Sequence, residues 1–90
     1  MERETNWKLK FSKRAVKDWF LLKDKGLDAK AEKLLKIIRL NPYQSPPSFE
    51  KLVGVTDTYS RRINITHRLV YRLNKTDKLV EVLSMFRHYS

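Results

Sequence analysis

The amino-acid sequence contains no cysteine, few glycines and few prolines. Its 90 residues include two glycines and three prolines. Without cysteine, neither a disulfide nor a thiolate metal site can brace the fold, which therefore depends on the packing of apolar side chains. Two glycines are too few for a glycine-rich phosphate-binding loop. We expect one small domain, residues 1–90, that needs no cofactor and fits a reducing cytoplasm.

Signals for a membrane or a metal are also missing from the sequence. No apolar stretch approaches the roughly 20 residues that cross a bilayer. The residues that follow Met1 are charged and polar, unlike a secretory signal peptide. The histidines and acidic residues do not show the spacing of a metal site. We therefore expect neither contact with a membrane nor a bound metal ion.

Acidic residues are scarce relative to basic ones. The chain has 20 Lys and Arg against 10 Asp and Glu, a formal net charge of +10. Such an excess indicates a polyanionic partner, namely RNA, DNA, an acidic protein segment or an anionic lipid surface, although part of the charge also serves solubility. Composition leaves two classes open: an enzyme that acts on nucleic acid, and a basic module that only binds.

The first half of the sequence predicts one strand and two helices. Residues 7–11 alternate apolar and basic side chains, which is the period of a strand. Ser12 fits the N-cap of a first helix, and Gly26 fits its end. Asp28 fits the cap of a second helix, which ends before Pro42. Because one glycine separates the two helices, we predict an antiparallel hairpin.

Apolar and basic side chains take opposite sides of this hairpin. The aromatic residues expected in the core are Trp7, Phe11, Trp19 and Phe20. The outer face of the second helix carries Lys30, Lys33, Lys36 and Arg39. This separation is typical of a helix that packs one side on a sheet and exposes the other.

The second half predicts strands after a stiff loop, residues 42–47, that holds all three prolines. Residues 49–52 follow as a short strand or extended segment. The main strands are predicted at 59–65, 67–73 and 79–89, where β-branched and aromatic residues recur between polar turns. The order β-α-α-β-β-β predicts an α+β domain, with the helical hairpin packed on one face of a twisted, mostly antiparallel sheet.

Metal-free RNA cleavage requires three groups, and few side chains of the second half could supply the base and the acid: they are Glu50, Asp57, Asp77, Glu81, His67 and His88. A base removes the 2′-OH proton, a cation stabilises the transition state, and an acid protonates the leaving 5′-oxygen. Glu50 supplies a carboxylate, Arg68 a planar guanidinium that can bind two phosphate oxygens, and His88 an imidazole. Each also has an ordinary interpretation, respectively a solvated loop acid, one arginine of a surface ladder and a tail residue.

Further candidates surround these three. The arginines on the two middle strands are Arg61, Arg62, Arg68 and Arg72. The tyrosines that could stack on RNA bases are Tyr43, Tyr59 and Tyr89. His67 lies at a turn, and we expect a structural or solvated role for it. Taken from the residues alone, the sequence predicts a small basic α+β domain with the parts for metal-free RNA cleavage.

Four short segments carry a family resemblance. They are Phe49-Glu50-Lys51-Leu52, Tyr59-Ser60-Arg61-Arg62-Ile63-Asn64, His67-Arg68-Leu69-Val70-Tyr71 and the closing His88-Tyr89. Together they resemble the YoeB/Txe toxins of the RelE superfamily, which belong to bacterial type II toxin–antitoxin systems. The Ser-Arg-Arg-Ile and His-Arg-Leu-Val-Tyr block is the most specific part. The predicted order of helices and strands also matches this family.

The resemblance implies a ribosome-dependent endoribonuclease that cuts mRNA in the A site, stops translation and acts in the bacterial cytoplasm. It implies a cognate antitoxin of the YefM type, whose acidic disordered segment folds onto the toxin. It further implies a homodimer, and a toxin–antitoxin complex that represses its own operon. If the protein acts on the ribosome, we expect the basic face of the second helix to bind ribosomal RNA through Lys30, Lys33 and Lys36.

Catalytic roles follow from the resemblance residue by residue. Glu50 matches the family's general base, Arg68 its transition-state arginine and His88 its general acid. Tyr89 matches a supporting tyrosine, and Arg62 matches a basic residue that holds substrate phosphate. The remaining RNA-binding candidates are Arg61 and Lys51.

Two departures from the family pattern stand out. Val53 occupies a position where relatives often have lysine, and Lys51 is a candidate substitute. Ser90 extends the chain beyond the His-Tyr end. The alternatives to the enzyme are a non-catalytic basic module that binds nucleic acid or an antitoxin, and a ribonuclease that acts without the ribosome.

Overall fold

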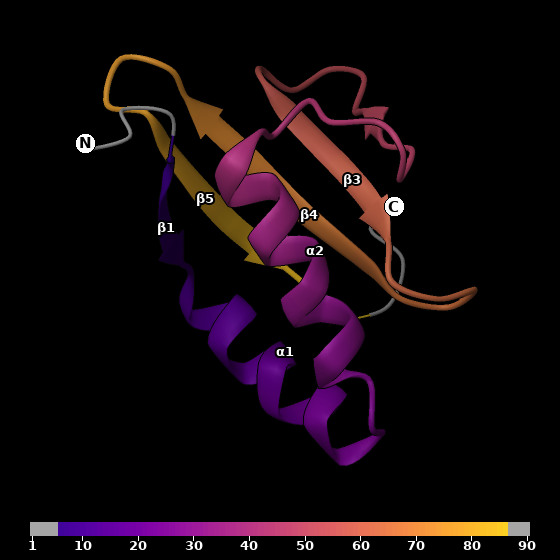
Figure 1. Ribbon diagram of the computed structural model, residues 1–90. Coiled ribbons are helices and arrows are strands. Elements are labelled where there is room, and N and C mark those ends of the chain that lie inside the picture. Colours follow the sequence, from indigo (N-terminus) through magenta and orange to yellow (C-terminus); the bar gives the residue numbers. More distant parts are fainter. Residues whose placement is uncertain (1–5, 87–90) are drawn as a thin grey trace.

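In the computed structural model, which describes residues 6–86, two helices lie across one face of a five-stranded sheet (Figure 1). The elements are β1 (Lys8–Phe11), α1 (Lys13–Asp24), α2 (Asp28–Leu40), β2 (Glu50–Lys51), β3 (Thr58–Arg62), β4 (Arg68–Asn74) and β5 (Leu79–Ser84). The predicted α+β class and helical hairpin are confirmed. The two-residue strand β2 lies within the segment predicted as extended.

The strand order in the sheet is β1-β5-β4-β3-β2. Strands β2 to β5 pair antiparallel, and β1 pairs parallel with β5. Strands β1 and β5 are the first and last of the chain, so the helical hairpin together with β2, β3 and β4 forms the long connection that a parallel pair requires. The prediction of a mostly antiparallel sheet is therefore correct.

Two strands are shorter than predicted. Strand β3 ends at Arg62 because the side chain of Asn64 starts a tight turn, accepting hydrogen bonds from the backbone N–H of Thr66 at 2.9 Å and His67 at 2.7 Å. Strand β5 ends at Ser84 rather than continuing to residue 89. Residues 87–89 of that prediction lie outside the described part of the chain.

Helix α1 begins and ends as its sequence predicts. The Ser12 side chain accepts a hydrogen bond from the backbone N–H of Ala15 at 3.0 Å, which caps the helix. Gly26 follows the helix with a φ of 71°, a left-handed conformation that glycine adopts without strain. The hydroxyl of Ser12 also donates to the Leu83 carbonyl at 2.8 Å, which ties the start of α1 to β5.

Helix α2 starts differently from the prediction. Its N-cap residue is Leu27, which makes no side-chain cap hydrogen bond, so the prediction of Asp28 as the cap is wrong. Asp28 is instead the first helical residue, where its negative charge interacts favourably with the positive end of the helix dipole. The helix then buries Ala31, Leu34, Leu35 and Ile38 against the sheet.

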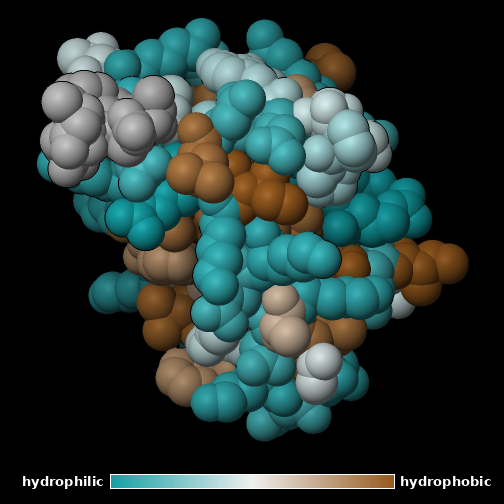
Figure 2. Space-filling model, viewed as in Figure 1, coloured by the Kyte–Doolittle hydropathy of each residue, from teal (hydrophilic) through white to brown (hydrophobic). Residues whose placement is uncertain are grey.

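The core lies between the hairpin and the helix-facing side of the sheet. Its sheet side consists mainly of Leu69, Tyr71, Leu73, Val80 and Val82. Two aromatic residues expected in the core are exposed instead, since Phe11 is 37% and Phe20 is 59% accessible. Trp7 and Trp19 pack against the core from its edge. Figure 2 shows apolar atoms in several places among the hydrophilic ones on this face, including the side of the molecule where β1 leads into α1.

A carboxylate occupies a core position on α1 that the sequence did not reveal. Asp18 is only 5% accessible, and its Oδ2 accepts a hydrogen bond from the backbone N–H of Met85 at 2.9 Å. The same oxygen lies 3.7 Å from Nε of Arg14. Asp18 therefore holds the chain directly after β5, where the sheet ends.

Candidate active site

The two middle strands present different chemistry on their two faces. In the antiparallel register, Ser60 pairs with Val70 and Arg62 pairs with Arg68. Side chains alternate along a strand, so these residues share the face away from the helices. Their neighbours Tyr59, Arg61, Leu69 and Tyr71 are buried on the helix side.

Glu50, Arg68 and Ser60 meet on the open face. Nη1 of Arg68 donates to Oε1 of Glu50 at 3.4 Å and to Oγ of Ser60 at 3.2 Å. The sheet positions all three, because β2 places Glu50 opposite Ser60 on β3, and Arg68 starts β4. Within the described residues, this is where the predicted base and the predicted transition-state arginine come together.

Accessibility gives each member of this cluster a distinct character. The Glu50 side chain is 67% accessible and the Arg68 side chain 15%. Ser60 is buried at 2%. Nε and Nη2 of Arg68 make no hydrogen bond to any group in residues 6–86, so their N–H groups remain available to a ligand. In such a cluster the free donors of the guanidinium can bind a phosphodiester, and the exposed carboxylate beside it can accept a proton.

The predicted acid His88 and its neighbour Tyr89 lie outside the described residues. The described chain ends at Phe86, whose ring stacks on His67 with a 4.3 Å centroid distance. His67 directly precedes Arg68 and is only 5% accessible, so of the two roles expected for it, structural or solvated, burial agrees with the structural one.

Arg61 is fully buried, and this corrects its prediction as an RNA-binding residue. Its Nη1 donates to the Pro47 carbonyl at 2.7 Å, and its Nη2 donates to the carbonyls of Pro42 at 3.0 Å and Gln44 at 2.9 Å. Its Nε donates to the Tyr71 hydroxyl at 3.1 Å. A guanidinium with 0% exposure and these four bonds has no surface for RNA.

The Arg61 contacts instead position the proline loop. Proline has no backbone N–H, so the loop satisfies few carbonyls by itself, and Arg61 supplies the donors. The Tyr71 hydroxyl adds a donor to the Pro42 carbonyl at 2.9 Å, and burial raises the pKa of this tyrosine above 10.0. The loop leads directly into β2, so Arg61 fixes the approach to Glu50.

Tyr59 is also buried, so its prediction as a base-stacking residue is wrong. It is 6% accessible and lies between the rings of Tyr43, Phe49 and Tyr71, each with a centroid 5.7 or 5.8 Å away. Tyr43 remains 41% accessible. The other basic candidates, Lys30, Lys33, Lys36, Lys51 and Arg62, are all exposed.

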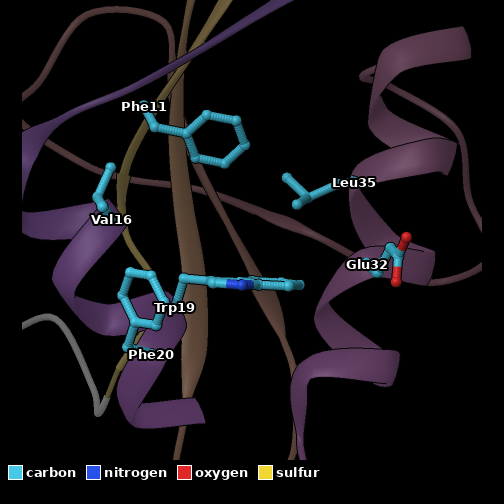
Figure 3. Close-up of a pocket in the computed structure, with 6 residues that line it drawn as sticks. All are labelled: Phe11, Val16, Trp19, Phe20, Glu32 and Leu35. Carbon is cyan, nitrogen blue, oxygen red and sulfur yellow. The ribbon is translucent and has the colours of Figure 1, made fainter. Parts of the chain in front are cut away.

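A separate apolar groove lies between the two helices, away from the Glu50 cluster. Figure 3 shows Phe11, Val16 and Phe20 on one side, while the Trp19 ring extends toward Leu35 and Glu32 of α2. The groove contains one acidic residue and no basic one among its lining side chains. Exposed apolar groups that gather in this way are typical of a protein contact surface.

Two negative findings apply to residues 6–86. No group of three or more His, Cys, Asp or Glu side chains could hold a metal ion there. Neither described helix has the length and apolar character needed to cross a membrane.

Comparison with known proteins identifies related sequences and structures. Residues 11–89 match a family described as "YoeB-like toxin of bacterial type II toxin-antitoxin system". No curated protein matches the sequence. A YoeB/ParE toxin from Agrobacterium tumefaciens is 27% identical with a TM-score of 0.82, covering 91% of this chain and 99% of that one.

Two solved structures from Staphylococcus aureus are more similar in sequence. A YoeB dimer is 34% identical with a TM-score of 0.77, covering 93% of this chain and 99% of that one. A heterotetrameric YoeB-YefM toxin-antitoxin complex is 36% identical with a TM-score of 0.76, covering 92% and 98%.

Proposed function

This chain belongs to the YoeB-like toxin family of bacterial type II toxin–antitoxin systems, and from that premise we propose that it is a ribosome-dependent endoribonuclease. It cuts mRNA in the ribosomal A site and thereby inhibits translation in the bacterial cytoplasm. The observation that carries this proposal is the cluster on the open face of the sheet, where Arg68 bridges Glu50 and Ser60.

The proposed reaction is attack of a 2′-OH on the adjacent phosphorus. Glu50 accepts the hydroxyl proton, and the new 2′-oxygen–phosphorus bond forms as the bond to the 5′-oxygen breaks. Arg68, with Arg62, stabilises the charge on the equatorial oxygens. His88 protonates the departing 5′-oxygen, and Tyr89 orients or stacks on the nucleotide. The products are a 2′,3′-cyclic phosphate, which can open to a 3′-phosphate, and a 5′-OH end.

The chemistry makes the substrate class specific. DNA lacks the nucleophilic 2′-OH, so DNA is not cut. The basic and acidic steps each contribute about 100- to 10,000-fold to the rate. The mechanism needs no metal ion, because the arginines supply the positive charge. The ribosome is expected to order the substrate, so activity on naked RNA should be weak.

The direct test is the position and chemistry of mRNA 5′ ends produced on ribosomes. Wild-type protein should give 5′-OH ends in the A-site codon, and Glu50→Gln and His88→Ala should lose about 100-fold or more in rate. Asp24→Asn, at the exposed end of α1, is the matched charge control and should cleave normally. Wild-type cleavage by both active-site variants would remove the catalytic assignment.

A basic module that only binds is the rival interpretation. It predicts ribosome or RNA binding without new RNA ends. A ribosome-independent ribonuclease predicts equal cleavage of naked and ribosome-bound mRNA. The same end-sequencing experiment, repeated with naked mRNA, separates both alternatives from the proposed function.

The proposed protein partners are a YefM-like antitoxin and a second copy of the chain. The formal charge of +10 suits an acidic antitoxin segment. We assign the homodimer contact to the apolar groove between α1 and α2, where Val16 is 47% and Phe20 59% accessible. The Staphylococcus aureus relative described as a YoeB dimer supports a dimer of this chain.

Sedimentation of the purified chain tests the assigned dimer contact. Phe20→Glu should convert the dimer to a folded monomer, because a buried unpaired carboxylate opposes association. Leu40→Glu is the control, since Leu40 is 58% accessible and lies outside the groove. A Phe20→Glu protein that sediments as the wild-type dimer would place the interface elsewhere.

A further inference from the structure

A second groove runs between α2, the proline loop and the end of β3. Its apolar lining comes from Leu34, Ile37, Pro46, Pro47 and Ile63. Its other lining residues are Lys30, Lys33 and Arg62. The groove is open to solvent and has a volume of about 460 Å³. It therefore combines an apolar surface with three positive charges and has no acidic residue in its lining.

The three cations of this groove are free to bind a ligand. Lys30, Lys33 and Arg62 are exposed, and none forms an ion pair within residues 6–86. Lys30 and Lys33 lie three residues apart on α2, so they share one face of the helix. Positive charges that converge on a low-dielectric surface focus the electrostatic field and attract anions.

Arg62, at the end of β3, lines this groove and is also the neighbour of the candidate active site. In the β3–β4 ladder, Arg62 lies directly opposite Arg68. Directly paired residues of an antiparallel ladder have Cα atoms about 4.5 to 5.5 Å apart. A polyanion held at Arg68 therefore reaches Arg62 first, and from Arg62 it reaches the lysines of α2.

We propose that this groove binds the single-stranded RNA that flanks the cleaved bond. Phosphates lie at Arg62, Lys30 and Lys33, and the adjacent bases pack on the apolar lining. The proposal rests on the function proposed above and changes one of its details. Lys30 and Lys33 contact the substrate strand rather than ribosomal RNA, whereas Lys36, which does not line the groove, stays with the ribosome.

Single-stranded RNA suits this groove better than a helical duplex. A duplex pairs its bases with each other, which leaves only phosphate and sugar for a protein surface, whereas an unpaired strand can turn its bases onto apolar side chains. An acidic peptide could also satisfy the three cations. The position of Arg62 opposite Arg68 favours RNA, because a strand bound at Arg68 can extend across Arg62 into the groove.

Binding measurements with an uncut oligoribonucleotide test the groove directly. The full chain carrying Glu50→Gln is titrated into a fluorescent single-stranded RNA, with or without the pair Lys30→Ala and Lys33→Ala. The matched control pair is Lys17→Ala and Lys23→Ala, which removes the same charge from exposed positions on α1. The pair of substitutions in the groove should weaken RNA binding about 10-fold or more, because it removes two charges that contact phosphate. The control pair should weaken RNA binding less than about threefold, because its lysines lie away from the bound RNA.

Salt dependence supplies a second readout of the same complex. Each phosphate contact in single-stranded RNA contributes about 0.7 to the slope of log affinity against log salt. Loss of two contacts should therefore flatten the slope by about 1.4 in the groove pair only. Ile37→Ser should also weaken binding, whereas Leu40→Ser, outside the groove, should not. Circular dichroism confirms that each variant is folded.

Three outcomes overturn the groove proposal. Equal losses of RNA affinity in the groove variant and in the control variant would show that only the total charge matters. Unchanged RNA affinity with lost binding of an acidic peptide, such as an oligoglutamate, would make the groove a peptide site. Unchanged binding of both would leave the groove without either role. Wild-type cleavage on ribosomes is measured in parallel, so that failure of the proposed function is distinguished from failure of the groove.

Discussion

Two arginines on neighbouring strands, Arg61 and Arg68, show how differently the two sides of the sheet use the same side chain. Arg61 lies on the helix side, is fully buried and donates four hydrogen bonds to fixed protein oxygens. Arg68 lies on the open side, and within residues 6–86 only its Nη1 has partners. One guanidinium is satisfied by the protein, and the other keeps donors for a ligand.

This difference separates stability from activity. A buried cation is tolerated only where hydrogen bonds replace its lost water, so the helix side satisfies Arg61 almost completely. A site that binds phosphate must leave donors unfilled in the free protein. The protein therefore accepts an incompletely satisfied group on the open side, where solvent still reaches the cluster through the exposed Glu50.

Removal of the Arg68 guanidinium should give the largest effect on activity. Arg68→Ala should lower the rate of mRNA cleavage on ribosomes by about 100- to 1,000-fold, because a donor to the transition-state charge is lost. The free energy of unfolding in urea should fall by only about 1 to 2 kcal/mol, because the largely buried Arg68 side chain loses its hydrogen bond to Ser60 while its carboxylate partner Glu50 is solvent-exposed. If Arg68→Ala instead lowered the stability strongly and left the cleavage rate of the folded protein unchanged, Arg68 would have a structural role like that of Arg61.

Removal of the Arg61 guanidinium should give the opposite pattern. Arg61→Leu removes the four hydrogen bonds of the guanidinium, and of their acceptors the Pro42 carbonyl still has the Tyr71 hydroxyl as a donor. The expected cost is about 3 to 5 kcal/mol in the free energy of unfolding. Such a loss is a large part of the stability of a small domain. Urea titration measures it. Normal stability with weakened RNA binding would restore Arg61 as an RNA contact.

The sequence could not show which of these two arginines is buried, since both lie on predicted strands and follow a polar residue, Ser60 and His67 respectively. The deciding information is tertiary: the proline loop places the carbonyl groups of Pro42, Gln44 and Pro47 against the Arg61 guanidinium. Once the register that pairs Arg62 with Arg68 is known, the alternation of side chains along a strand places Arg61 and Arg68 on opposite faces of the sheet. That register depends on the turn at Asn64, which period-2 patterns do not specify.

Other parts of the fold were predictable because their signals are local. The Ser12 cap and the Gly26 end of α1 depend on residues within a few positions of each other. The burial of Asp18 was not predictable, because its partner Met85 is 67 residues away in sequence. Phe20 was assigned to the core because helical spacing gives a stripe, but tertiary packing decides which edge of that stripe faces solvent.

Ser60 offers a finer test of the open side. Its buried hydroxyl accepts a hydrogen bond from the same Nη1 that binds Glu50. Ser60→Ala removes a hydrogen bond that holds the Arg68 guanidinium in place. A misplaced guanidinium should lower kcat about 10-fold, while KM for ribosomes changes little. Ser60→Thr keeps the hydroxyl and should recover most of the rate. Equal activity of all three proteins would show that Ser60 does not position Arg68.

Arg72 should give the smallest effect, although it lies on the same strand face as Arg68. Its Nε donates to Oε1 of Glu81 at 2.8 Å, and the register places these residues opposite each other on β4 and β5. Both side chains remain partly exposed, at 51% and 27%, so Arg72→Ala should reduce stability by less than about 1 kcal/mol. The rate of mRNA cleavage should stay within about threefold of wild type, since Arg72 is paired with Glu81 and a partly exposed charge contributes little. An Arg72→Ala protein as inactive as Arg68→Ala would mean that the open face acts through its total charge, and not through the particular geometry that joins Arg68 to Glu50.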